Sequence, residues 1–223
     1  MASHLDLEEQ EQLDQLKAFW NSYGNLITWV LTLALAAYAG WVGWGWWQRD
    51  QAVKAAAMYD ELDRAVQAGE VDKATRVFAD LKDRHPRTTY AAQAALLAAK
   101  LQADKGQADN ARASLEWTAA NAHADEYRDL ARLRLAGLQL DAKQYDEAAK
   151  TLDAVKSVDF AALVADRRGD LALLQGKPEL AKAEFQKAYA ALDKTLDYRR
   201  LVEVKLASLG VAVADDADKK VAQ

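Results

Sequence analysis

The chain has 223 residues with 29 Lys and Arg against 34 Asp and Glu, a net charge of −5, no Cys, 2 Pro and 10 Gly. The lack of Cys excludes disulfides, thiolate catalysis and thiolate zinc sites, and the charge balance lacks the basic footprint typical of nucleic-acid binding. Abundant alanine with little proline predicts an all-α protein.

Residues 1–25 are predicted to be an N-terminal amphipathic arm. Five acids against Lys17 make it acidic, and its apolar residues fall near one side of a helix: Leu5, Leu13, Leu16, Phe19 and Trp20. The Asn and Gly residues between Asn21 and Asn25 predict a break after this helix. Such a helix would lie at the membrane interface or against its own anchor, or else dock on the cytoplasmic loops of a partner.

Residues 26–47 are predicted to be a transmembrane helix. No charged side chain lies between Lys17 and Arg49. Twenty-two helical residues rise about 33 Å, enough to cross a hydrocarbon core of about 30 Å. Six of the seven tryptophans lie between Trp20 and Trp47, at the two ends of the span, as headgroup-level rings do. Thr28 and Thr32 can donate their hydroxyls to carbonyls one turn back.

A cleavable signal peptide is the alternative, because Ala37, Tyr38 and Ala39 have the small-x-small form of a cleavage site. The preceding arm is acidic where a signal peptide is basic, and the apolar run continues through tryptophans beyond that site. We therefore expect the anchor to be retained.

Small residues four apart in the span would let another membrane helix approach closely. The alternative is that these residues are only tolerated in lipid. The candidates for transmembrane packing are Ala36, Ala39, Gly40 and Gly43.

Residues 48–209 are predicted to be a solenoid of about four helix pairs plus a capping helix, entered from the span without a flexible linker. Gly69, Gly106 and Gly176, with Lys143 in the same role, each precede an alanine by five residues, and the alanines recur at spacings of 37, 37 and 33. This period and its Ala-x-x-x-Phe-x-x-Ala pattern match the tetratricopeptide repeat (TPR). An ordinary antiparallel bundle would share part of the pattern.

Small residues are expected where the two helices of a pair cross. These contacts would pair Ala99 with Ala111, Ala136 with Ala148, and Gly169 with Ala181, whereas Leu62 in the first pair indicates a degenerate repeat.

A final helix over residues 196–209 would turn Leu201, Val204 and Leu209 inward and end at Gly210. Residues 210–223 are polar and rich in alanine, which predicts a disordered tail.

The sequence offers little for catalysis, and we expect no enzyme, metal site or cofactor. His4, His85 and His123 lack metal-ligand spacing, and no nucleotide-binding or hydrolase motif occurs. A hydrolase hidden in the solenoid would need a deep pocket with paired titratable groups.

Binding is expected on the concave face of the solenoid, which the first helix of each pair lines. Some of its residues would pack instead of bind. By repeat register this face presents Tyr59, Asp63, Leu96, Lys100, Leu133, Asp166 and Asp170.

Three stretches carry a family resemblance: Leu16-Lys17-Ala18-Phe19-Trp20, Gly45-Trp46-Trp47-Gln48, and residues 161–170, AALVADRRGD. With the register of Gly176, Ala181, Phe185 and Ala188, the chain resembles the YfgM family of bacterial inner-membrane TPR proteins.

The resemblance implies an ancillary partner of the SecYEG translocon, with a cytoplasmic N-terminus and a periplasmic TPR domain. Such a protein would scaffold a PpiD-like periplasmic chaperone and emerging substrates. The flanking charges point the other way, because Lys17 alone precedes the span whereas Arg49 and Lys54 follow it. A cytoplasm-facing TPR adaptor of a signalling or division complex is therefore the alternative.

Overall fold

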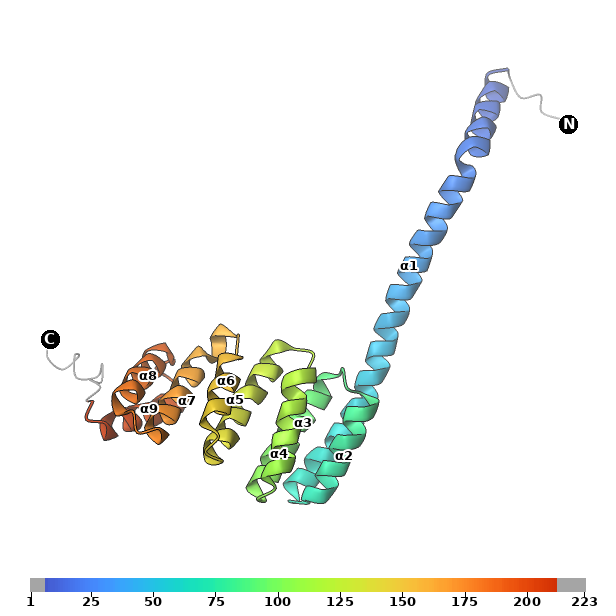
Figure 1. Ribbon diagram of the computed structural model, residues 1–223. Helices are drawn as coiled ribbons and strands as arrows, with labels where there is room; N and C mark the ends of the chain where they lie inside the picture. Colours follow the sequence, from blue (N-terminus) through green and yellow to red (C-terminus); the bar gives the residue numbers. More distant parts are fainter. Residues whose placement is uncertain (1–6, 212–223) are drawn as a thin grey trace. The chain divides into compact units, whose positions relative to one another are not determined.

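The computed structural model describes residues 7–211, with side chains from Gln10 onward, and all regular structure in this range is helical, as predicted. The chain divides into two compact units, Met1–Gln51 and Ala52–Gln223. The helices, labelled in Figure 1, are α1 (Leu7–Gln67), α2 (Val71–Arg84), α3 (Thr89–Asp104), α4 (Ala108–Asn121), α5 (Asp125–Asp141), α6 (Tyr145–Asp153), the short 3₁₀ helix η1 (Val158–Phe160), α7 (Ala161–Leu174), α8 (Pro178–Ala191) and α9 (Asp197–Ser208).

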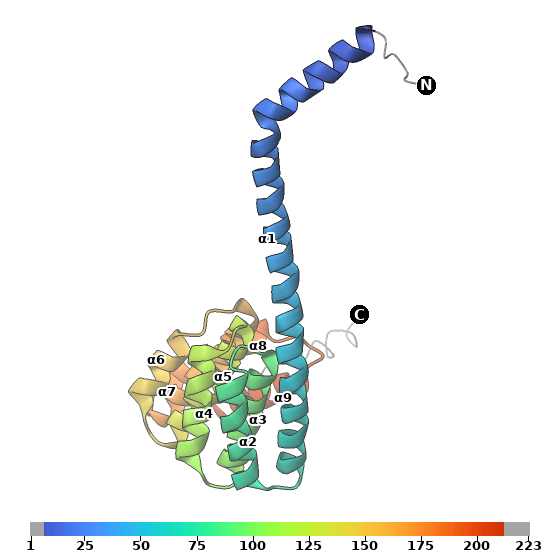
Figure 2. The same ribbon diagram turned by 90° about the vertical axis from the view of Figure 1, so that its right-hand side faces the viewer.

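In the first unit, the predicted break at residues 21–25 is wrong, because α1 stays helical throughout. Instead, the helix bends towards its N-terminal end (Figure 2). Gly24 is buried beneath the ring of Trp20, where an added Cβ would lie 3.0 Å from the ring. The Thr28 hydroxyl donates to the Gly24 carbonyl at 2.8 Å, a bond that bends helices without ending them.

The same unit holds the candidate span. Within the described residues, α1 is the helix long and apolar enough to cross a membrane, with a mean hydropathy of 1.7 in its best window and no residue of that window buried. Thr32 donates to the Thr28 carbonyl at 2.7 Å, as expected for hydroxyls in an apolar span.

The second unit is built of four helix pairs and a capping helix. The pairs are residues 52–67 of α1 with α2, α3 with α4, α5 with α6, and α7 with α8, and α9 follows. Figure 1 shows α2 to α9 following one another in chain order. Each helix contacts its near neighbours, and α3, α5 and α7 also contact one another in sequence. This nearest-neighbour stacking is that of a TPR-like solenoid.

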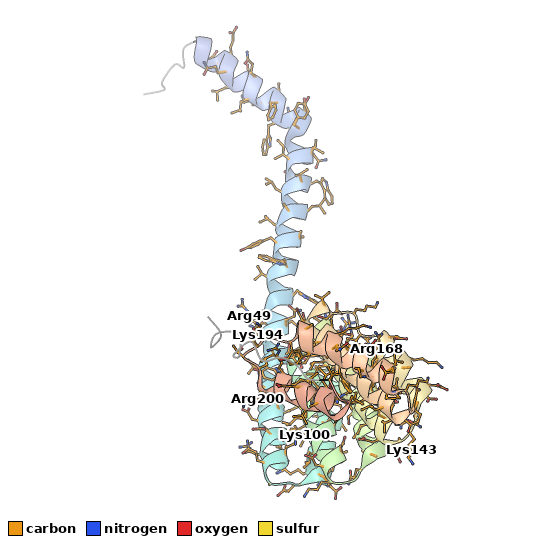
Figure 3. All side chains as sticks on the ribbon, turned by 90° about the vertical axis from the view of Figure 1, so that its left-hand side faces the viewer. Arg49, Lys100, Lys143, Arg168, Lys194 and Arg200 are labelled. Carbon is orange, nitrogen blue, oxygen red and sulfur yellow. The ribbon has the colours of Figure 1, made fainter. Side chains whose placement is uncertain are left out.

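Each pair is joined by the same turn. Gly69, Gly106, Lys143 and Gly176 all have positive φ, between 59° and 76°. In each turn this residue donates its N–H to the carbonyl three residues back, and the next residue donates to the carbonyl five residues back, which is the Schellman arrangement. Lys143, marked at the end of its helix pair in Figure 3, is the non-glycine among them.

The small residues expected where paired helices cross are buried, namely Ala99, Ala111, Ala136, Ala148 and Ala181, and two details differ from the expectation. Gly169 lies against the ring of Phe185, where an added Cβ would come within 2.4 Å of the ring, so the close approach involves Phe185 and not only Ala181. In the first pair Leu62 is fully buried in the core, and Ala65 supplies the small residue that shares a cluster with Ala74.

The capping helix α9 faces inward on a different side from the one predicted. Val202 and Leu206 are fully buried, whereas Leu201 and Val204 are exposed. The reason is the core cluster between α7 and α8, centred on Phe185 of α8, because this cluster accepts the two buried side chains. Leu209 and Val211 pack partly against the same cluster, so the chain stays ordered beyond Gly210, and the rest of the predicted tail lies outside the described residues.

Candidate protein-binding groove

A hollow of about 580 Å³ lies along the first helices of successive pairs. Its lining comes from α3, α5 and α7, with Leu115 of α4 and Tyr198 of α9. A second hollow of about 400 Å³ shares Gly137, Asp141 and Arg167 with the first and continues between α5 and α7. We call the two together the α5 groove.

The α5 groove has apolar walls and charged side chains among them. Leu130, Leu133, Leu138 and Leu163 line it with Ala99 and Ala103. Its charged lining residues are Lys100, Asp104, Arg134, Asp141, Arg167 and Asp170. Open apolar surface with a few fixed charges suits an extended polypeptide better than a small substrate.

The capping helix is held to α7 by a network of charges at the groove wall. Asp166 is 0% exposed, and it accepts hydrogen bonds from the Tyr198 hydroxyl at 2.6 Å and from Lys205 Nζ at 2.7 Å. Lys205 also donates to Asp170 at 2.7 Å, and Arg167 donates to the second oxygen of Asp170 at 3.0 Å. Burial, and then the hydrogen bond to Asp166, raise the pKa of Tyr198, so this hydroxyl remains a donor.

The structure brings three of the seven predicted concave residues into the groove. Lys100 and Leu133 line the first hollow, and Asp170 lines the second. These residues come from three successive pairs, as the repeat register predicts.

The other four lie outside it. Leu96 is buried in the core with Ala99 and Leu115, and Tyr59 packs its ring 5.8 Å from that of Tyr90. Asp63 accepts a hydrogen bond from Gln67. Asp166 is fully buried and holds α9, so its assignment to a ligand-facing surface is wrong.

Register alone missed four of the charged lining residues, namely Asp104, Arg134, Asp141 and Arg167, and two of them lie on α5. These two, Arg134 and Asp141, lie on one face of α5 with Leu130, Gly137 and Leu138, all of which line the first hollow. Their spacing of three and four residues could have revealed this face, since such residues are neighbours on a helix.

In the first unit, Ala36, Ala39, Gly40 and Gly43 are exposed on α1, and a Cβ added at either glycine would meet nothing within 4 Å. A helix-packing role for them stays a prediction. Among the described residues, no group of three acidic or histidine side chains is arranged to hold a metal ion.

Comparison with known proteins gives the same architecture. The model of the tetratricopeptide repeat-like domain family matches residues 17–211. A protein of Neisseria gonorrhoeae named an ancillary SecYEG translocon subunit is 31% identical over 94% of this chain and 100% of its own length. Proteins with the same name from Escherichia coli and Haemophilus influenzae are each 30% identical, over 91% and 82% of this chain and 97% and 89% of their own lengths.

The chain belongs to the YfgM family of ancillary SecYEG translocon subunits. The predicted family is thereby confirmed. Members of this family have a protein-interaction role and not an enzymatic one.

Proposed function

We propose that this protein is a single-span membrane protein that associates with the SecYEG translocon and presents its TPR domain in the periplasm. There it would scaffold a PpiD-like chaperone and polypeptides that emerge from the channel. The observation that carries this proposal is the likeness to translocon subunits over nearly the whole chain, the apolar stretch of α1 included.

The α5 groove supports a scaffolding role. A polypeptide leaving the translocon is extended and exposes apolar side chains, and the groove offers leucine and alanine walls along three successive helix pairs. The uncharged stretch of α1 would dock laterally on the channel or on the anchor of the chaperone, through Gly40 and its small neighbours.

Site-specific photocrosslinking in living cells tests the association. A photoreactive residue at Gly40 should give adducts with translocon subunits or with the anchor of the chaperone, and one at Lys100 should give adducts with a periplasmic chaperone or a secreted polypeptide. The matched control is Lys150, which is exposed on α6 away from the groove. Adducts from Lys100 with cytosolic proteins would contradict the proposal.

One observation favours the opposite topology, namely the placement of Arg49 and Lys54 after the span with Lys17 alone before it. Alkaline phosphatase fused to the C-terminus distinguishes a periplasmic from a cytoplasmic TPR domain, because this enzyme is active only after export. An active fusion supports the periplasmic TPR domain. An inactive but stable fusion supports a cytoplasm-facing adaptor instead.

A further inference from the structure

Among the described residues, the α5 groove contains one cation without an acidic partner, namely Arg134. Lys100 is paired with Asp104 at 2.7 Å, and Arg167 is paired with Asp170 at 3.0 Å. In the part of the chain that the structure describes, no carboxylate lies within ion-pair distance of Arg134. The groove therefore has a single unpaired guanidinium between two cations that already have partners.

Arg134 is held in place by a contact that leaves most of its donors unused. Its Nη1 donates to the backbone carbonyl of Leu96 at 3.1 Å, which fixes the side chain of α5 against α3. A guanidinium has five N–H groups, so the others stay available to a ligand. The groove walls remove part of the water around this group, and this desolvation lowers the pKa of Arg134 with no neighbouring acid to offset it.

The surroundings of Arg134 strengthen any ion pair formed there. Leu130, Leu133, Leu138 and Leu163 line the same hollow, so a bound chain would cover the pair with apolar side chains on both sides. The attraction between opposite charges grows as water is excluded from around them. A guanidinium also matches a carboxylate in shape, since two parallel N–H groups face its two oxygens.

We propose that the α5 groove selects extended apolar segments that carry an acidic side chain, with the Asp or Glu carboxylate seated on Arg134 and the flanking apolar residues on the leucine walls. This inference rests on the proposed role of the groove as a polypeptide-binding surface. It adds a specificity, namely for a single carboxylate between apolar residues.

The occupant is a side-chain carboxylate within a chain and not a chain terminus. The first hollow continues past Arg134 into the second through Gly137, Asp141 and Arg167, so a segment has surface to follow on both sides of the guanidinium. Asp141 lies seven residues along α5 from Arg134, about 10 Å away along the helix axis. It repels a second acid, so one acidic residue per segment is favoured over an acidic run.

The test measures binding of short fluorescein-labelled peptides to the full-length protein in detergent. The peptides alternate valine, leucine and serine, have both ends blocked, and carry Glu, Gln or Lys at the centre. A fourth peptide has Gln at the centre and a free C-terminal carboxylate. The variants are R134Q, the charge-conserving R134K, D141N and K150Q, the last of which removes an exposed cation of α6 outside the groove.

We expect the wild type to bind the Glu peptide about tenfold more tightly than the Gln peptide, and R134Q to abolish this preference. R134K should retain only part of the preference, because a lysine ammonium keeps the charge but cannot offer two parallel N–H groups to a carboxylate. D141N should leave the preference equal or enlarged, and K150Q should change it by less than about twofold. The preference should shrink in about 0.5 M NaCl because salt screens the pair. Retention of the wild-type thermal unfolding curve by R134Q shows that a loss of binding is not a loss of fold.

The remaining outcomes overturn the inference. If the Glu and Gln peptides bind the wild type equally, the groove binds polypeptides without the selectivity claimed here, and the proposed function stands. If the free C-terminal carboxylate alone gives the preference, the occupant is a chain end and the assignment to a side chain is wrong. If no peptide binds, the peptide-binding role of the groove fails as well, whereas the translocon association is judged separately by the crosslinks from Gly40.

Discussion

Replacing Gly169 by alanine should destabilise the protein, although the same change elsewhere in these helices stabilises it. Gly169 lies within α7, and an added Cβ would come within 2.4 Å of the Phe185 ring, more than 1 Å closer than an ordinary contact. Phe185 is fully buried in its core cluster and has no room to withdraw.

The expected change in the free energy of unfolding is the difference between two opposing effects of the added methyl group. Overpacking of this kind costs about 3 kcal/mol, whereas Gly to Ala within a helix gains about 1 kcal/mol. G169A should therefore lose about 2 kcal/mol, which lowers the Tm of a domain of this size by about 4–8 °C. Gly137, within α5, is the matched control because an added Cβ there meets nothing within 4 Å. G137A should raise the Tm by about 2–4 °C.

The assay is thermal unfolding of the full-length variants in mild detergent, followed by circular dichroism. A double-mutant cycle with F185L completes the test, because the smaller side chain removes the clash. In the F185L background G169A should cost less than about 0.5 kcal/mol. The reasoning is refuted if G169A stabilises as G137A does, or if its cost is the same with leucine at position 185.

The other predictions also use matched positions of the repeat. K143G should stabilise the protein by about 1 kcal/mol, because Lys143 has a φ of 59°, where L-residues are strained. G106K at the equivalent turn should destabilise the protein by a similar amount. Stability changes of the same sign for the two variants in urea unfolding would contradict this. Gln102 and Gln139 occupy the same register position. The Gln139 Oε1 atom is buried and has no hydrogen-bond partner among the described residues, whereas the Gln102 side chain donates to Thr75 and accepts from Ser114 at 2.9 Å each. Q139L should therefore raise the Tm and Q102L should lower it. Burial opposes the charge of Asp129, but hydrogen bonds from Ser157 N–H, Arg132 and Lys156 N–H outweigh it and lower the pKa of Asp129 below its ordinary 3.8. The stability that this carboxylate contributes is present at neutral pH and is lost as the pH falls through its folded-state pKa. D129N should therefore cost about 2 kcal/mol at neutral pH and should flatten the plot of stability against pH below about pH 4. The same plot for D129N and the wild type would rule this out.

Local sequence patterns were sufficient to predict a structural feature wherever that feature depends on the types of residue at known positions. The turn glycines gave the repeat period, and the uncharged stretch of α1 gave the candidate span, since both signals lie in contiguous residues.

Side-chain facing in the last helix could not be read in this way. The spacing of Leu201, Val204 and Leu209 suggested an inward face, but Val202 and Leu206 are the buried pair. Both choices satisfy helical periodicity, and the cluster around Phe185 decides between them. The break predicted at residues 21–25 failed in the same way, because the chain stays helical there with the ring of Trp20 lying over Gly24.

The sequence by itself determined the class of fold, the number of repeats, the apolar stretch and the family, because each depends on residue types at fixed spacings. Only the tertiary structure decided which charges are free to bind a partner. Asp166 and Arg134 are both charged residues on first helices of the stack. Lys205 of α9 neutralises Asp166 and Tyr198 donates a hydrogen bond to it, whereas no carboxylate of the described residues pairs with Arg134. Ion pairing depends on which distant helices come within a few ångströms of each other, and no spacing along one helix records that.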